Sequence, residues 1–181
     1  ISIKKNINLS LIHNESNGIQ LVSHRFEKEK QILEIKFKKT KYKIYLNLIG
    51  KIQVTNILMA IIAANNSGIE FKKILKILPR ITSVEGRLEK IGKIHNNSKV
   101  ILDYAHTPAA LESALSNLKE QFPSNKINLI FGCGGDRDLK KRPLMGKIAE
   151  KYSNEIYLTD DNPRNEKPFK IRNEIKKGIK N

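Results

Sequence analysis

The regular alternation of strand-like and helix-like segments after Thr82 limits the possible folds of this chain more than any other feature. Short apolar runs alternate with stretches in which apolar residues recur at helical spacing. The expected strands cover 100–102, 127–131 and 156–158, and the helices that follow them cover 108–121, 143–152 and 169–179. Such repeats predict parallel strands joined by right-handed crossovers. This part of the chain is therefore expected to be a mostly parallel α/β domain.

The helix expected at 108–121 has the clearest boundary signals. Thr107 is placed to cap its N-terminus, and Pro108 suits the first turn because that position needs no backbone N–H. One face of this helix is expected to be apolar, formed by Leu111, Ala114, Leu115 and Leu118.

The residues before Thr82 follow a different pattern. Three strand-like stretches are expected at 18–23, 32–37 and 43–48, before a helix at 51–66 and a short helix at 71–78. The apolar residues of the longer helix that recur at helical spacing are Ile52, Leu58, Met59, Ile62 and Ala63. This change of pattern predicts a domain boundary near 80–86, with domains at 1–82 and 83–181.

The formal net charge of +16, from 34 Lys and Arg against 18 Asp and Glu, raises the possibility of a nucleic-acid partner. The lysines are scattered among Ile and Asn, without interleaved aromatic residues for base stacking. A compositional bias is therefore the preferred explanation, and no nucleic-acid partner is expected, although a basic nucleic-acid binder remains an alternative. The basic patches are Lys4–Lys5, Lys28–Lys30, Lys36–Lys43, Lys72–Lys73 and Lys176–Lys177.

The cellular compartment is inferred from what the sequence lacks. Cys133 is the only cysteine, so no internal disulfide can form, and no Cys/His spacing resembles a zinc site. There is no signal-peptide pattern and no apolar run long enough to span a membrane. A cytoplasmic protein without a membrane span is expected.

Three unusual polar clusters directly follow the three strands of the second part. They read D-Y-A-H-T-P at 103–108, G-C-G-G-D-R-D at 132–138 and T-D-D-N-P-R at 159–164. Because ligands of open parallel sheets bind beyond the carboxyl ends of the strands, the clusters are expected to converge on one site.

The first two clusters suit different contacts. Asp103 can accept hydrogen bonds from ribose hydroxyls, and His106 offers a flat ring and a donor. The glycines at 132–135 allow close backbone approach, and Arg137 can hold a carboxylate with two parallel hydrogen bonds. The alternatives are a turn-capping aspartate, a solvated histidine and a tight turn with a surface arginine. No G-x-x-x-x-G-K-[ST] phosphate loop occurs in the chain.

The third cluster combines acceptors and donors, as an amino-acid ligand requires. Asp160 or Asp161 can face an ammonium group, Asn162 and Arg164 can face carboxylates, and Pro163 stiffens the loop. An ordinary surface turn is the alternative.

These motifs, in order and spacing, resemble the C-terminal domain of the Mur ligases. The second motif continues as G-C-G-G-D-R-D-x-x-K-R-P-L-M and the third as D-D-N-P-R-x-E, while G-R-L-E at 86–89 resembles the start of that domain. I-G-K-I-Q-V-T-N-I-L-M-A-I at 49–61 resembles the end of the central ATPase domain. The resemblance implies an α/β fold, with the end of a central ATPase domain followed by a Rossmann-like C-terminal domain, both incomplete.

The resemblance also implies a reaction that adds the third amino acid of a peptidoglycan precursor. ATP, with Mg²⁺, would phosphorylate the D-glutamyl γ-carboxylate of UDP-MurNAc-L-Ala-D-Glu, and the amine of the incoming amino acid would attack the acyl phosphate. D-N-P-R is the form associated with meso-diaminopimelate, whose second carboxylate gives Arg164 a bidentate partner that lysine lacks. A lysine-adding or folate-type ligase and a non-catalytic nucleotide- or amino-acid-binding module remain alternatives. A monomer is expected.

The resemblance also implies roles for individual residues. Gln53 stands where relatives often have asparagine, so the resemblance is weaker for the nucleotide contacts of the helix expected at 51–66. No catalytic residue or metal ligand is assigned. The residues expected at ATP are Asn56, Arg87, Asp103 and His106. The residues expected at the amino acid are Arg137, Asp161, Asn162, Pro163 and Arg164.

The family's phosphate loop, UDP-binding domain and magnesium ligands have no counterpart in the sequence. An internal fragment of a ligase is therefore expected, unable on its own to hydrolyse ATP.

Overall fold

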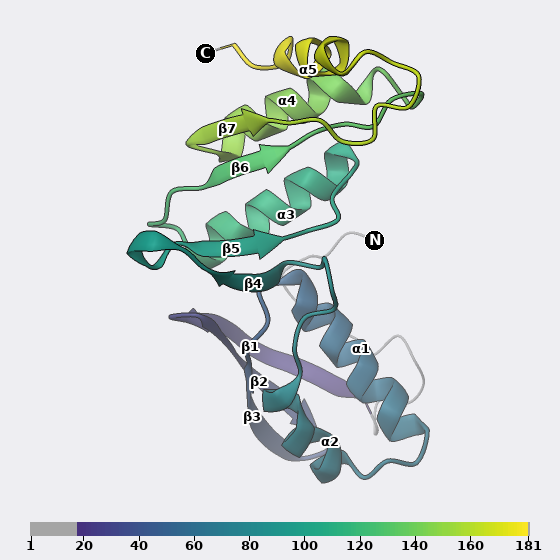
Figure 1. The fold of residues 1–181 in the computed structure, drawn as a ribbon. Helices are drawn as coiled ribbons and strands as arrows, with labels where there is room; N and C mark the ends of the chain where they lie inside the picture. The colour runs from purple at the N-terminus through teal and green to yellow at the C-terminus, as the bar shows by residue number, and fades with distance from the viewer. Residues whose placement is uncertain (1–17, 181) are drawn as a thin grey trace. The chain divides into compact units, whose positions relative to one another are not determined.

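The computed structural model of the chain describes residues 18–180 (Figure 1). The Lys4–Lys5 patch and the beginning of the domain expected at 1–82 lie outside the described residues. The chain forms two compact units that divide between Leu102 and Asp103. The division expected after residue 82 lies earlier in the chain and stays a prediction. Between residues 18 and 180, no helix combines the length and the apolar character needed to cross a membrane.

The first unit begins with an antiparallel sheet of three strands. These strands are β1 (Ile19–Glu27), β2 (Lys30–Phe37) and β3 (Thr40–Leu46), in the order β1-β2-β3. Lys28 and Lys38 lie in the tight turns between them with φ of 55° and 54°, the left-handed conformation that two-residue hairpin turns need. The strands expected before Thr82 are thus confirmed, with shifted ends.

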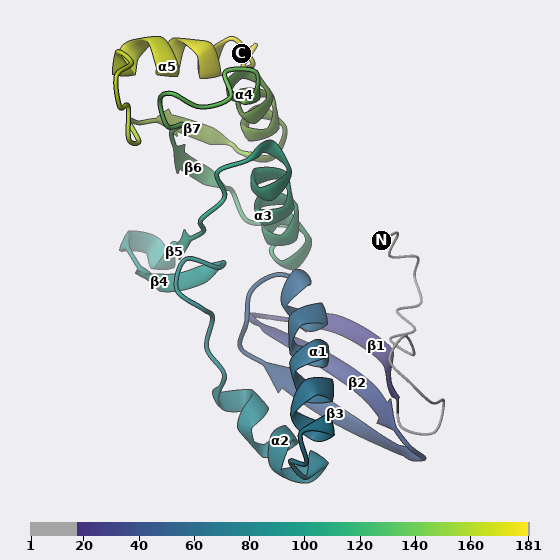
Figure 2. The same cartoon turned by 90° about the vertical axis from the view of Figure 1, so that its right-hand side faces the viewer.

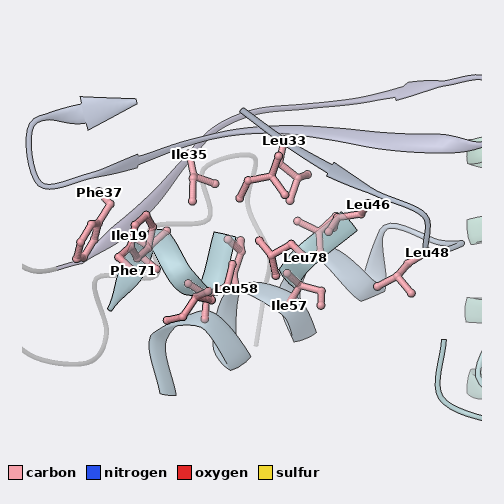
Figure 3. Packing of buried hydrophobic residues seen from close by; sticks show 14 residues of the cluster. Ile19, Leu33, Ile35, Phe37, Leu46, Leu48, Ile57, Leu58, Phe71 and Leu78 are labelled. Atoms are coloured by element: carbon pink, nitrogen blue, oxygen red, sulfur yellow. The ribbon is translucent and has the colours of Figure 1, made fainter. Parts of the chain in front are cut away.

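Helices α1 (Ile52–Asn66) and α2 (Phe71–Ile77) pack against one face of this sheet (Figures 2 and 3). The apolar face expected for α1 was partly wrong, because the side chains of Ile52 and Met59 are 44% and 57% exposed. Nearly every residue from Ile57 onward in this helix is apolar, so the sequence pattern alone does not select one face. The face that is buried consists of Val54, Ile57, Leu58 and Ile61.

Figure 3 shows the core of the first unit, in which strand side chains point toward the two helices. Leu33, Ile35, Leu46 and Leu58 are fully shielded from solvent, and each contributes about 1.5–3 kcal/mol through burial. Phe37 of β2 stacks on Phe71 of α2 with ring centroids 3.9 Å apart. Apolar burial therefore holds this unit together.

An antiparallel hairpin of β4 (Glu89–Lys93) and β5 (Lys99–Leu102) completes the first unit. Strand β5 was expected from the sequence, but as the first of three parallel strands; its pairing with β4, which was not expected, is antiparallel and lies in a separate sheet from β6 and β7. Glu29, in the β1–β2 turn, forms ion pairs of 2.7 Å with Lys90 and 3.4 Å with Lys99. These pairs attach the hairpin to the sheet of the same unit.

The second unit alternates helices and strands as expected. Strands β6 and β7 pair in parallel, and helices α3 and α4 lie on one side of this pair (Figure 2). Thr107 caps α3 by accepting a hydrogen bond of 3.3 Å from the backbone N–H of Ala110. The elements are α3 (Pro108–Gln121), β6 (Asn128–Phe131), α4 (Lys141–Tyr152), β7 (Glu155–Leu158) and α5 (Pro168–Lys176).

The core of the second unit is smaller. Its buried apolar residues gather around α4, where the close approach of α5 requires Gly146: a Cβ there would lie 2.1 Å from the carbonyl oxygen of Ile175. The buried cluster consists of Leu111, Leu115, Cys133, Met145, Ile171 and Ile175.

Candidate functional site

The three polar segments of the second unit meet at the first turn of α4. Lys141 donates a hydrogen bond of 2.9 Å from Nζ to the backbone oxygen of His106, in the segment before α3. Its neighbour Arg142 donates to the backbone oxygen of Gly134 in the loop after β6, at 3.2 Å, and to Glu166 in the loop after β7. The three segments therefore come together around the first turn of α4, and that they form one ligand site stays a prediction.

The loops after β6 and β7 leave the same end of their strands (Figure 1) and touch through their backbones. The N–H of Gly135 donates to the carbonyl oxygen of Asn162 at 2.8 Å. A Cβ at Gly135 would lie only 1.9 Å from the carbonyl oxygen of Pro163. Only glycine lets the two loops approach this closely.

Each loop contains one non-glycine residue in the left-handed region, Asp136 with φ of 50° and Arg164 with φ of 49°. Asp136 accepts two hydrogen bonds through Oδ2, from the backbone N–H of Asn165 at 3.3 Å and from its Nδ2 at 2.9 Å. Arg164 donates from Nη1 to the carbonyl oxygen of Gly135 at 2.8 Å. Such backbone conformations cost of order 1–3 kcal/mol and concentrate at ligand sites.

Arg142 is the charged centre beneath these loops. Its side chain is fully buried, and Nη1 and Nη2 donate to the two oxygens of Glu166 at 2.9 and 2.7 Å. Nη1 also donates to Glu174 of α5 at 2.5 Å. The Arg142 guanidinium, together with the N–H of Asp136, lowers the pKa of Glu166 to about 2. Glu166 raises the pKa of Arg142 in turn.

The residues expected at an amino acid surround this loop contact. Asp160 forms an ion pair with Arg172 of α5, whereas the side chain of Asp161 has no hydrogen bond or ion pair with any residue between 18 and 180. Of the two aspartates, Asp161 is thus the one available to an ammonium group. Arg137 and Arg164 are both exposed.

Two members of the same set also shape the loop itself. Asn162 accepts a hydrogen bond of 3.3 Å through Oδ1 from the backbone N–H of Arg164, and Pro163 accepts one of 3.0 Å from the N–H of Glu166. The hydrogen bonds found for the guanidinium of Arg164 within the described residues use only Nη1. Nη2 and Nε therefore remain for a carboxylate.

The residues expected at a nucleotide divide between the two units. In the first unit, Asn56 donates to Oε1 of Gln53 at 3.1 Å, and Nε2 of Gln53 donates to the backbone oxygen of Arg87 at 3.4 Å. Gln53 therefore links the two expected residues. In the second unit, Asp103 directly follows β5, and the ring of His106 bonds the backbone oxygen of Tyr104 through Nδ1 at 3.0 Å.

Sequence reasoning did not assign a role to Arg142, Glu166 or Asp136. Arg142 and Glu166 lie within the motifs that carry the family resemblance. A further signal was that Arg142 falls on the buried stripe of α4, which is otherwise formed by Met145, Gly146 and Ala149. A charged residue on an apolar stripe needs buried partners.

Comparison with known protein families agrees with the resemblance that the motifs show. The family model described as "Mur ligase, glutamate ligase domain" matches residues 86–181, just over half of the chain. The chain belongs to the Mur ligase family.

Several relatives of this Mur ligase chain carry names that state a specific activity. A UDP-N-acetylmuramoyl-L-alanyl-D-glutamate–2,6-diaminopimelate ligase from Buchnera aphidicola is 49% identical over 133 residues, which is 74% of this chain and 26% of the relative. A solved structure with the same ligase name is 32% identical, with a TM-score of 0.65, and the match covers 92% of this chain and 34% of that one. The chain spans roughly a quarter to a third of the length of such relatives.

A more distant likeness concerns the fold alone. A Mycobacterium tuberculosis folylpolyglutamate synthase, solved with ADP and AMPPCP, is 20% identical with a TM-score of 0.64, and the match covers 88% of this chain and 36% of that one. The α/β fold expected from the sequence is confirmed.

Proposed function

We propose that this chain is part of a ligase that uses ATP to join meso-diaminopimelate to UDP-MurNAc-L-Ala-D-Glu in peptidoglycan precursor synthesis. The observation that carries the proposal is the contact between the loops after β6 and β7. A Cβ at Gly134 in the loop after β6 would lie 2.8 Å from Nη1 of Arg164 and 3.8 Å from Oδ2 of Asp161, and exposed Arg137 follows three residues later. Two cations and an anion suit a ligand with two carboxylates and an ammonium group. The ligase names of relatives up to 49% identical support the same substrate.

The proposed residue roles follow from their chemistry. Arg164 holds the far carboxylate of diaminopimelate through Nη2 and Nε, with Arg137 as the second carboxylate partner. Asp161 accepts hydrogen bonds from an ammonium group, and Asn162 and Pro163 keep the loop in shape. Lysine lacks the far carboxylate and would leave a positioned donor unpaired, so diaminopimelate is preferred.

The proposed reaction forms an amide through an acyl phosphate. The γ-carboxylate of the D-glutamyl residue attacks the γ-phosphoryl group of ATP, and ADP leaves. The free amine of diaminopimelate then attacks the acyl carbonyl, and the tetrahedral intermediate expels phosphate as the amine loses a proton. The contribution of this chain is to orient the amino acid for that attack.

The nucleotide roles belong to the proposal as well. Asn56 lies at the adenine, Arg87 at the phosphates, and Asp103 and His106 at the ribose side. Use of Mg²⁺ and a cytoplasmic location are part of the same proposal. In the described part of the chain, no three His, Cys, Asp or Glu residues form a group that could hold a metal ion, and the proposal assigns no magnesium ligand there.

The test is ligation by the full-length protein that carries this sequence, given ATP, Mg²⁺ and UDP-MurNAc-L-Ala-D-Glu. meso-Diaminopimelate and L-lysine are offered in parallel. We expect product with diaminopimelate and little with lysine. Product chiefly with lysine would contradict the assigned substrate, and product with neither would favour a non-catalytic binding module.

A matched pair of variants tests the proposed amino-acid pocket, by which we mean the site formed by Arg137, Asp161 and Arg164 on the loops after β6 and β7. Arg164→Ala is expected to raise the KM for diaminopimelate by roughly 10–100-fold, which corresponds to the loss of a charge-assisted bidentate contact. Lys147→Ala also removes an exposed positive charge, but it lies on α4 away from the loops. An equal effect of the two substitutions would show that only net charge matters.

A further inference from the structure

A buried arginine at the start of α4 binds three segments outside its own helix. Arg142 contacts Gly134 in the loop after β6, Glu166 in the loop after β7 and Glu174 in α5. Its side chain is fully buried, while those of Glu166 and Glu174 are 16% and 19% exposed. A charge this deeply buried persists only with carboxylate partners and well-formed hydrogen bonds.

The geometry depends on arginine rather than on positive charge alone. The planar guanidinium presents two N–H groups to the two oxygens of Glu166 and still donates to Gly134 and Glu174. A lysine ammonium is a compact point charge without this fork, so it cannot reach the same partners at once.

Glu166 in turn connects the two loops next to the arginines of the proposed pocket. Its Oε1 accepts a hydrogen bond of 2.6 Å from the backbone N–H of Asp136, the residue before Arg137. Glu166 itself lies two residues after Arg164. One carboxylate therefore fixes the backbone beside both pocket arginines.

The same contacts pair the carboxylate of Glu166 with Arg142 rather than with Arg137 or Arg164. A carboxylate so near Arg137 and Arg164 is a potential competitor for the carboxylates of a ligand. Arg142 occupies both oxygens of Glu166, and this pairing holds the pKa of Glu166 at about 2, so the group stays ionised and engaged. The pocket arginines are thereby left to the ligand.

We propose that Arg142 and Glu166 are positioning residues for the amino-acid pocket, setting the spacing of Arg137 and Arg164, whereas Glu174 only anchors α5. This inference rests on the proposed function for the identity of the pocket. It concerns residues that do not touch the ligand, so their effect passes through the two loops.

The first test measures hydrogen exchange of individual backbone amides in the 181-residue chain. Glu166→Gln removes the negative charge that holds Arg142 and replaces one of the two acceptor oxygens by an NH₂ group, so exchange at Asp136 is expected to accelerate roughly tenfold, equivalent to about 1.4 kcal/mol. Glu174→Gln is expected to leave this amide unchanged. Glu112→Gln is the matched control, since it removes an ion pair with Lys151 in the same unit away from both loops.

Two results of the exchange experiment would contradict the proposal. Unchanged exchange at Asp136 in Glu166→Gln would overturn the proposal. An equal acceleration throughout β6 and β7 would also overturn it, because the carboxylate would then serve general stability. Arg142→Lys supplies a second variant, and acceleration confined to the loops is expected there too.

The second test separates positioning from stability in the full-length ligase. Glu166→Gln is expected to raise the KM for diaminopimelate roughly tenfold, with the KM values for ATP and the UDP-linked substrate unchanged. Glu166→Asp keeps the charge and should recover part of this loss. If the unsubstituted protein ligates no amino acid, the proposed function fails, while the exchange test still judges the loop coupling. If it ligates and Glu166→Gln leaves every KM unchanged, the positioning role fails.

Discussion

The two units of the chain are held together by different physical means. In the first unit, a sheet and two helices enclose a large apolar cluster that includes Leu33, Ile35 and Leu58 (Figure 3). The apolar cluster of the second unit is smaller. The largest fully buried side chain of that unit is the charged Arg142. Apolar burial is not directional, whereas a guanidinium bound to two carboxylates fixes the direction of each contact.

This difference matches what each unit has to position. The candidate residues Asn56 and Arg87 belong to a unit whose apolar scaffold forms without them. The candidate residues of the loops after β6 and β7 depend on a buried ion cluster that reaches directly into both loops. Stability and site geometry are therefore separable in the first unit and coupled in the second.

The largest expected effect comes from removing the charge at the centre of the second unit. Arg142→Met leaves Glu166 and Glu174 without their cation, and such a broken buried pair typically costs about 3–5 kcal/mol. Hydrogen exchange of β6 and β7 amides reports the opening free energy of this unit. Amides of β2 serve as the internal reference and are expected to stay unchanged. A loss below about 1 kcal/mol would contradict the central role of the ion cluster.

The corresponding change in the first unit is Leu58→Ala. Leu58 is fully buried between α1 and the sheet, and its truncation is expected to cost about 3 kcal/mol through lost apolar contacts and a cavity. Exchange of β2 amides is the measurement. The loss should be the same at pH 4 and pH 7, since no charge is involved, and a strongly pH-dependent loss would break the contrast between the units.

Local patterns predicted most of the elements in both units. Thr107 and Pro108 marked the start of α3, and the alternation of elements predicted the parallel pairing of β6 and β7. Strand β4 was missed because Glu89–Lys93 contains three charged residues and a glycine, which is not a strand-like pattern.

The ion cluster was beyond local reasoning. Arg142 meets Glu166 and Glu174 across 24 and 32 residues of sequence, and no periodicity encodes such a pairing. The meeting of the loops after β6 and β7 was predictable, because both loops leave the carboxyl ends of parallel strands. The contacts that hold the segments in place follow only from the packing of α4 and α5.

A third prediction concerns the contact between the two loops. Gly135→Ala places a Cβ against the carbonyl oxygen of Pro163, so the loops must separate, at an expected cost of about 1–3 kcal/mol. The KM for diaminopimelate in the full-length protein should rise together with the exchange rate of the Gly135 amide. Gly92→Ala in β4 is the matched control, because a Cβ there meets no atom within 4 Å. Equal effects at both glycines would argue against a tight loop contact.

The acid response should also distinguish the units. Arg142 holds the pKa of Glu166 at about 2, against an ordinary value of 4.5. The stabilisation from this ionised carboxylate is fully present above pH 4.5 and is lost as the pH falls from 4.5 toward 2. The opening free energy derived from exchange at the Asp136 amide, which donates to Glu166, should fall over that range, and Glu166→Gln should flatten the fall. An equally steep profile in that variant would assign the acid response to other carboxylates.

The smallest expected effect is that of substituting Gln53, which bonds both candidate nucleotide residues of the first unit, Asn56 and Arg87. Its bond to the backbone oxygen of Arg87 is long, at 3.4 Å, and lies at the surface, so Gln53→Ala should change the stability of α1 by less than about 0.5 kcal/mol. Nucleotide affinity of the full-length protein is expected to fall a few-fold, because Asn56 loses the partner that orients its side chain. Gln20→Ala, on the exposed side of β1, is the control. A loss of α1 stability equal to the loss of affinity would mean that the first unit, like the second, couples its site to its core.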